Sequence, residues 1–153
     1  MSESEVKSII EENRRHNEAL FSEYDPLTGV GSPIERVRLN LANDGRHILI
    51  PKYIASASAF AEMLQYPNLE EYIQARHLSR DDVHDVITRL RIKYDFEFWA
   101  ATCATIFDKT SGQEVKFKLR KAQRKLLKVL VETAFALRPI RVILVKARQW
   151  GGS

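Results

Sequence analysis

The strongest constraint on the fold is one long amphipathic segment, residues 118–136, which reads KLRKAQRKLLKVLVETAFA. At 100° per residue, its apolar side chains gather on one side of a helix and its cations on the other. The apolar side is formed by Leu119, Ala122, Leu126, Leu127, Leu130 and Ala134, and the opposite side by Lys121, Arg124, Lys125 and Lys128. The pattern predicts a helix with one apolar face and one basic face.

The residues after this segment indicate a strand and then a glycine-rich loop. Pro139 ends the connection, and residues 140–146, IRVILVK, form a β-branched apolar run typical of a buried parallel strand. A phosphate-binding loop needs a strand to aim it, glycines that let backbone N–H groups approach phosphate, a cation, and a hydroxyl for magnesium. Residues 146–153, KARQWGGS, supply most of these parts.

Compared with the common phosphate-loop pattern G-x-x-x-x-G-K-[ST], this loop has lysine and glycine exchanged. Gly151 and Ser153 are in register, whereas Lys146 stands at the first glycine and Gly152 at the lysine. On the pattern alone, this is a failed match. A cation on the other limb of the loop, Lys146 or Arg148, can still reach the phosphates, because its charge matters more than its place in the string.

One polar residue interrupts the apolar side of the predicted helix. Gln123 falls near the middle of the stripe, where an amide buried without partners costs about 1–3 kcal/mol. The backbone of a neighbouring loop would satisfy this amide. An adenine edge would also do so, since it presents one donor and one acceptor side by side. Phe117, just before the helix, offers an apolar or stacking surface for the same base.

The segments from Tyr94 to Leu127 and from Arg138 to Ser153 resemble the N-terminal part of the large terminase subunit of tailed bacteriophages. This subunit is the ATP-driven motor that packages DNA into proheads. The family carries a variant Walker A loop with an early basic residue, K-x-R-Q-x-G-x-[ST], and KARQWGGS agrees with it at every fixed position. Residues 1–93 match the family only loosely.

The resemblance implies a role for each matching residue. In the family, a glutamine upstream of the first strand contacts adenine, and Gln123 stands at the similar place. The candidate nucleotide-binding residues are therefore Phe117, from its position before the helix, and the matching residues Gln123, Lys146, Arg148, Gln149, Gly151, Gly152 and Ser153, with the Ser153 hydroxyl on magnesium. ATP and Mg²⁺ are the implied cofactors of the full-length parent. The implied partners are double-stranded DNA, the portal and the small terminase subunit, in the cytoplasm of a bacterial host.

Large terminases continue with an acidic Walker B strand, a catalytic glutamate, a coupling motif and a nuclease domain, and none of these is present in this sequence. The chain is therefore expected to be an N-terminal fragment, truncated in the Walker A loop and without catalytic residues of its own. We expect it to hydrolyse no ATP alone and to bind ATP weakly. The unpaired strand 140–146 would then be exposed, repacked or paired with another copy.

The expected fold is mainly α with a small β element, in three parts. Residues 1–31 form an amphipathic arm and a loop, residues 32–115 a mostly helical region, and residues 116–153 the start of a truncated P-loop α/β ATPase domain. The apolar stripe of the arm consists of Val6, Ile9, Ile10, Leu20 and Phe21. A β-hairpin is expected at 36–50, because period two continues through Val37, Leu39 and Leu41 and Asp44-Gly45 suits a turn. A helix capped at Ser32 is the competing interpretation.

Helical patterns follow from residue 52 onward. One runs over residues 53–65, a short one over 68–77, and a third begins at Ser79, followed by Asp81 and Asp82. Residues 94–108 are predicted to form a buried helix, with a buried stripe formed by Phe96, Trp99, Ala100, Cys103 and Phe107. Cys103 would then be a small core residue and not a nucleophile. KTSGQE, residues 109–114, is predicted as a turn.

Charge is distributed unevenly along the chain. Residues 116–153 hold eleven Lys or Arg and one acidic residue, net +10, whereas residues 1–115 hold thirteen basic and nineteen acidic residues, net −6. Such asymmetry suggests an anionic partner near the C-terminal end, either nucleotide phosphate or nucleic acid. A solvated lysine face on an ordinary helix accounts for the charge equally well.

Three alternatives stay open beside the terminase interpretation. The first is a nucleic-acid-binding module that uses the basic face of residues 118–136. The second is a helicase-like ATPase, against which Gly152 counts. The third is an assembly surface in residues 1–93. Scattered histidines and a single cysteine predict no metal site, and no apolar stretch is long enough to span a bilayer.

Overall fold

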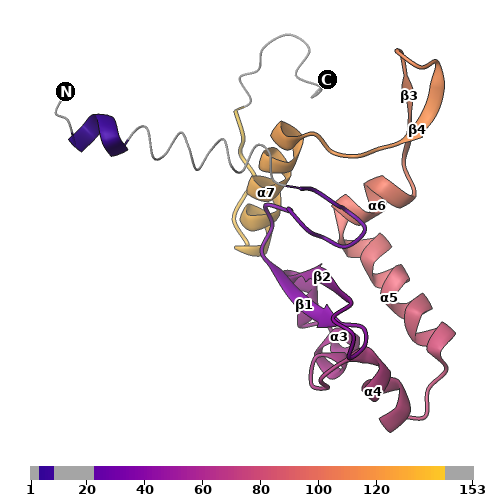
Figure 1. Ribbon diagram of the computed structural model, residues 1–153. Helices are drawn as coiled ribbons and strands as arrows, with labels where there is room; N and C mark the ends of the chain where they lie inside the picture. Colours follow the sequence, from indigo (N-terminus) through magenta and orange to yellow (C-terminus); the bar gives the residue numbers. More distant parts are fainter. Residues whose placement is uncertain (1–3, 9–22, 144–153) are drawn as a thin grey trace.

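The computed structural model describes residues 4–8 and 23–143, which form a mixed α/β fold of helices and two small antiparallel hairpins (Figure 1). Residues 4–8 are helical. The further elements are β1 (Arg36–Asn40), β2 (His47–Pro51), α2 (Lys52–Ala55), α3 (Ser58–Met63), α4 (Leu69–Ala75), α5 (Arg80–Tyr94), α6 (Phe96–Thr102), β3 (Thr105–Asp108), β4 (Gln113–Lys116) and α7 (Lys121–Phe135). Within the described residues, no helix is long and apolar enough to cross a membrane.

The hairpin predicted at 36–50 is confirmed. Strands β1 and β2 pair antiparallel, with Leu39 opposite Ile48. Gly45 closes the connection with a φ of +85°, a conformation that glycine adopts without strain. The competing helix capped at Ser32 does not form. The Ser32 side chain instead makes hydrogen bonds within its own loop and to α6. Its Oγ accepts the N–H of Ile34 at 3.2 Å and donates to the Glu97 carboxylate.

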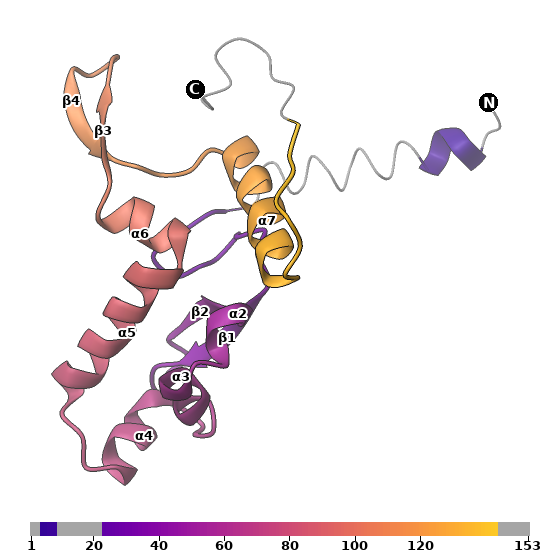
Figure 2. The same ribbon diagram turned by 180° about the vertical axis from the view of Figure 1, so that it is seen from behind.

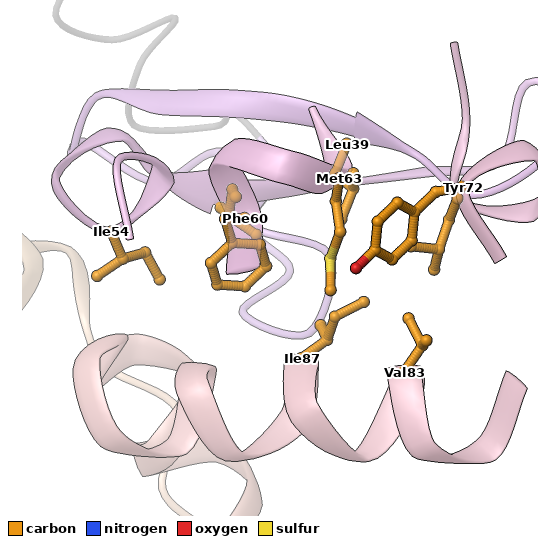
Figure 3. Packing of buried hydrophobic residues seen from close by; sticks show 9 residues of the cluster. Leu39, Ile54, Phe60, Met63, Tyr72, Val83 and Ile87 are labelled. Atoms are coloured by element: carbon orange, nitrogen blue, oxygen red, sulfur yellow. The ribbon is translucent and has the colours of Figure 1, made fainter. Parts of the chain in front are cut away.

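The core lies between this hairpin and the helices that follow it. Alternation along the strands turns Leu39 and Ile50 to one face, where both are buried. Helices α2, α3, α4 and α5 contribute the remaining large side chains, and Phe60 and Met63 face Ile87 across the core (Figure 3). The full buried cluster is Leu39, Ile50, Ile54, Phe60, Met63, Leu69, Tyr72, Val83 and Ile87.

Helices α4 and α5 begin at side-chain caps. The Asn68 Oδ1 accepts the N–H of Glu71 at 2.9 Å, and the Ser79 Oγ accepts the N–H of Asp82 at 3.5 Å. Asp81 and Asp82 lie in the first turn of α5, as predicted, where negative charge favours a helix N-terminus. The helix predicted at 53–65 is instead divided into α2 and α3.

The prediction of a buried helix at 94–108 is wrong in its length and in the face that is buried. Helix α6 ends at Thr102, and Phe107 lies on β3, 66% exposed. The side chains of α6 that are buried are Glu97, Phe98 and Ala100, whereas Phe96 and Trp99 are largely exposed and Cys103 is exposed. Ion pairs made by Asp95 and Glu97 select this face, and the apolar spacing does not show them.

The second hairpin was not predicted as strands, although its turn was. Strands β3 and β4 pair antiparallel from Thr105 opposite Lys116 to Asp108 opposite Gln113. The Asp108 carboxylate accepts the N–H groups of Thr110 and Ser111, each at 3.1 Å, which is the local bonding expected of an aspartate turn. The hairpin projects away from the helices (Figure 2).

The strand predicted at 140–146 is not observed over the four residues that the structure describes. Residues 140–143 have no regular structure, and Ile143 is 94% exposed. A buried parallel strand needs a neighbouring strand on its edge, and the described residues provide none beside it. Residues 144–146, which end with Lys146 of the predicted loop, lie outside the described residues.

Candidate functional site

The candidate site lies at the start of α7, where the sequence predicts an adenine contact. Helix α7 forms at residues 121–135, in agreement with the predicted helix at 118–136. Gln123 occupies its first turn and is half-buried. The side chain acts as a cap, because its Oε1 accepts the backbone N–H of Arg120 at 2.8 Å. The structure thus supplies a backbone partner for the amide oxygen, one of the two alternatives that the sequence left open.

Phe117 stands between the second hairpin and α7. Its backbone N–H donates to the Ala104 carbonyl at 3.1 Å, and its side chain is half-buried. Leu119, two residues later, is 7% exposed and fixes the approach of the chain to the helix. Phe117 and Gln123 therefore flank the same end of α7.

Arg124, predicted on the DNA-binding face, is directed toward the protein. Its guanidinium carbon lies 3.7 Å from the centre of the Tyr24 ring, and its Nη1 donates to the Gly31 carbonyl at 3.3 Å. The Lys118 ammonium lies 5.4 Å from the same ring. Tyr24 is 8% exposed, so two cations meet a buried aromatic face. These contacts join the loop of residues 23–35 to α7, and no sequence pattern predicts them.

A buried ion-pair cluster lies close to the Tyr24 phenol, which interacts with Glu97. Arg36 on β1 binds both oxygens of Asp95, at 2.8 and 3.0 Å, and donates to Glu97 at 2.7 Å. Arg91 on α5 lies 3.6 Å from Asp95 and donates to the Leu27 carbonyl at 2.8 Å. Two cations and two carboxylates thus balance within the fold, and they tie β1, α5, α6 and the 23–35 loop together.

The electrostatic environment of these groups follows from their burial and pairing. Burial alone would lower the pKa of Arg36, but the hydrogen bonds and charges of Asp95 and Glu97 raise it. Burial and the nearby Glu97 carboxylate raise the pKa of the Tyr24 phenol. Burial and the charge of Asp95 raise the pKa of Tyr53 to about 12. Arg36 therefore stays protonated at neutral pH, and both phenols stay neutral.

The other three predicted DNA-binding residues lie along α7. Lys125 is exposed, and Lys128 lies 3.6 Å from Glu132 one turn later. Partial desolvation, with Lys125 and Arg124 close by, lowers the pKa of Lys121. The three lysines therefore form a concentrated positive strip on the outer side of the helix.

The residues of the predicted phosphate loop lie outside the described residues: Lys146, Arg148, Gln149, Gly151, Gly152 and Ser153. Among residues 4–8 and 23–143, no three His, Cys, Asp or Glu side chains come together in a way that could hold a metal ion. No protein-family model, curated protein or solved structure matches this chain.

Proposed function

We propose that the chain is the N-terminal part of a large terminase subunit, a DNA-packaging ATPase, and that residues 116–153 begin its ATP-binding domain. The observation that carries the proposal is the agreement of KARQWGGS with the variant Walker A loop at every fixed position. The amphipathic helix α7 precedes this loop, and Gln123 lies in its first turn. ATP and Mg²⁺ would be the ligands, with double-stranded DNA, the portal and the small subunit as partners.

The role proposed for Gln123 is compatible with its capping bond. An amide has an acceptor oxygen and two donor hydrogens, and the capping bond to Arg120 uses the oxygen. In this arrangement the NH₂ group would donate to an adenine ring nitrogen while the oxygen caps the helix. Phe117, at the same end of α7, would cover one face of the base.

The test is saturation-transfer difference NMR of the 153-residue chain with millimolar ATP, which detects weak binding. We expect transfer to the adenine protons, with less transfer to guanine protons of GTP. Gln123→Glu keeps the capping oxygen and removes the donor, so it should abolish the adenine signal while α7 stays folded. Lys146→Ala should weaken binding of the triphosphate and leave the signal from adenosine unchanged.

Gln113→Glu on β4 is the matched control, since it makes the same change at an exposed position. It should leave the ATP signal unchanged. Absence of transfer from the wild-type chain at millimolar ATP would contradict the proposal. A signal insensitive to both Gln123→Glu and Lys146→Ala would do so too.

A second candidate function is nucleic-acid binding by α7. The placement of Lys121, Lys125 and Lys128 on one face of α7 favours it. Desolvation first, and then the nearby charges of Lys125 and Arg124, lower the pKa of Lys121. Such a strip attracts polyanions without any nucleotide site. In this arrangement Lys121, Lys125 and Lys128 would contact phosphates, while Arg124 holds Tyr24.

A further inference from the structure

A groove lies between α3, α4 and α5, at the far side of the core from β1. Its volume is about 380 Å³. Met63 and Val83 form its inner wall (Figure 3), and Leu78 and Val86, each 41% exposed, form its outer edge. Apolar side chains this exposed at the mouth of a groove mark a surface that another chain can cover.

The rim of this groove is acidic. Glu62 on α3 and Asp82 on α5 both line it. The surrounding segment, residues 58–86, holds six Asp or Glu and two Lys or Arg. One of these cations, Arg76, lies 3.6 Å from Glu62, and an exposed pair of this kind contributes little. The groove therefore suits an apolar side chain that is flanked by cations.

Helix α7 has the complementary chemistry. None of its residues is buried, although its sequence is strongly amphipathic. Val129 is 48% exposed, and Lys125, one turn earlier on the same outer side, is exposed as well. An apolar side chain with a lysine at i−4 is what the groove accommodates.

The groove of a chain cannot receive its own α7. The helix is held at one end by Arg124 against Tyr24 and at the other by Phe135, whose ring stacks on Tyr53 at 4.2 Å. Both views show α7 beside the 23–35 loop and away from α4 (Figures 1 and 2). Occupancy of the groove by α7 must therefore involve two molecules.

We propose that the α3–α5 groove of one copy binds α7 of a second copy, with Val129 between Leu78 and Val86 and Lys125 beside Asp82. Charge favours the pairing of the groove with α7 over a pairing of two α7 helices. Two copies of α7 would bring like charges together. The contact joins two different surfaces, so each bound copy still offers a free groove and a free helix. Association of this kind continues with concentration unless it closes into a ring.

The test is the weight-average mass of the purified chain by sedimentation velocity over a concentration series. The mass should rise above 17.7 kDa with concentration. It should fall again as salt is increased, because the pairing of Asp82 with Lys125 is exposed to screening. Asp82→Lys and Lys125→Glu should each weaken association about tenfold or more, since each places like charges opposite one another. The double variant, with the charges exchanged, should recover it.

Matched controls separate the contact from general charge effects. Asp81→Lys makes the same change in the same turn of α5, at a residue that does not line the groove. Lys93→Glu reverses a lysine on α5, outside α7 and outside the lining of the groove. Both should associate as the wild-type chain does. A wild-type chain that stays monomeric at all concentrations would overturn the proposal, as would equal effects of Asp81→Lys and Asp82→Lys. A double variant without recovery would also contradict it.

Discussion

Arg36 makes the most consequential side-chain contacts in the fold. It holds two buried carboxylates, and its own side chain is 4% exposed. Arg36→Met keeps the aliphatic stem but leaves Asp95 and Glu97 without their main cation. Breaking a buried pair on one side costs about 3–5 kcal/mol, because a charge remains uncompensated. Urea unfolding followed by circular dichroism should show a loss of this size in the free energy of unfolding.

The control for this substitution is Arg38→Met, two residues along the same strand. Arg38 lies on the same face of β1, but it is exposed and donates to Asn40. Its loss should change the free energy of unfolding by about 0.5 kcal/mol or less. If Arg36→Met lowers the free energy of unfolding as little as Arg38→Met does, the ion-pair cluster contributes no stability.

Sequence reasoning identified neither Arg36 nor its partners as important. Asp95 stands 59 residues away in the chain and Glu97 stands 61 residues away. Local periodicity contains no information about contacts at such separations, and a single sequence offers no other signal for them. The same limit explains Gln123. The sequence places it in the apolar stripe, but the capping bond to Arg120 depends on the residue at which α7 begins.

At the scale of elements, the 23–35 loop depends on the backbone at Gly31. A Cβ built there would lie 1.9 Å from the Glu23 carbonyl oxygen, and φ is +72°. Gly45 has a similar φ of +85° but nothing within 4 Å. Gly45→Ala should therefore cost only the left-handed conformation, about 1–2 kcal/mol. Gly31→Ala must also displace the backbone that carries Tyr24.

The difference between the two glycine substitutions can be measured at Arg124. Stacking on Tyr24 should shift the guanidinium protons of Arg124 in the NMR spectrum, through the ring current of the tyrosine. Gly31→Ala should remove that shift and lower the free energy of unfolding more than Gly45→Ala does. If both variants keep the shift and lose equal stability, the loop does not depend on close approach at Gly31.

Elements with strong local signals were predictable and the others were not. The hairpin of β1 and β2 follows from alternation and a turn sequence, and α4, α5 and α7 from periodicity and caps. The second hairpin was missed because Cys103 and Phe107 continue the helical spacing of Phe96 and Trp99 beyond Thr102, where α6 ends. The strand predicted at 140–146 shows the converse. An apolar β-branched run becomes a strand only beside a neighbour.

For the molecule as a whole, the two partners proposed for α7 would compete for the same basic side chains. Both the proposed self-association and nucleic-acid binding use Lys125, so the two should exclude one another. A short DNA duplex at low salt should bind the chain and return it to a monomer by sedimentation. Lys125→Glu should reduce the slope of log affinity against log salt by about one, because one phosphate contact is lost. Lys93→Glu should leave the slope unchanged. Assemblies that persist with DNA bound would show that the two partners occupy different surfaces.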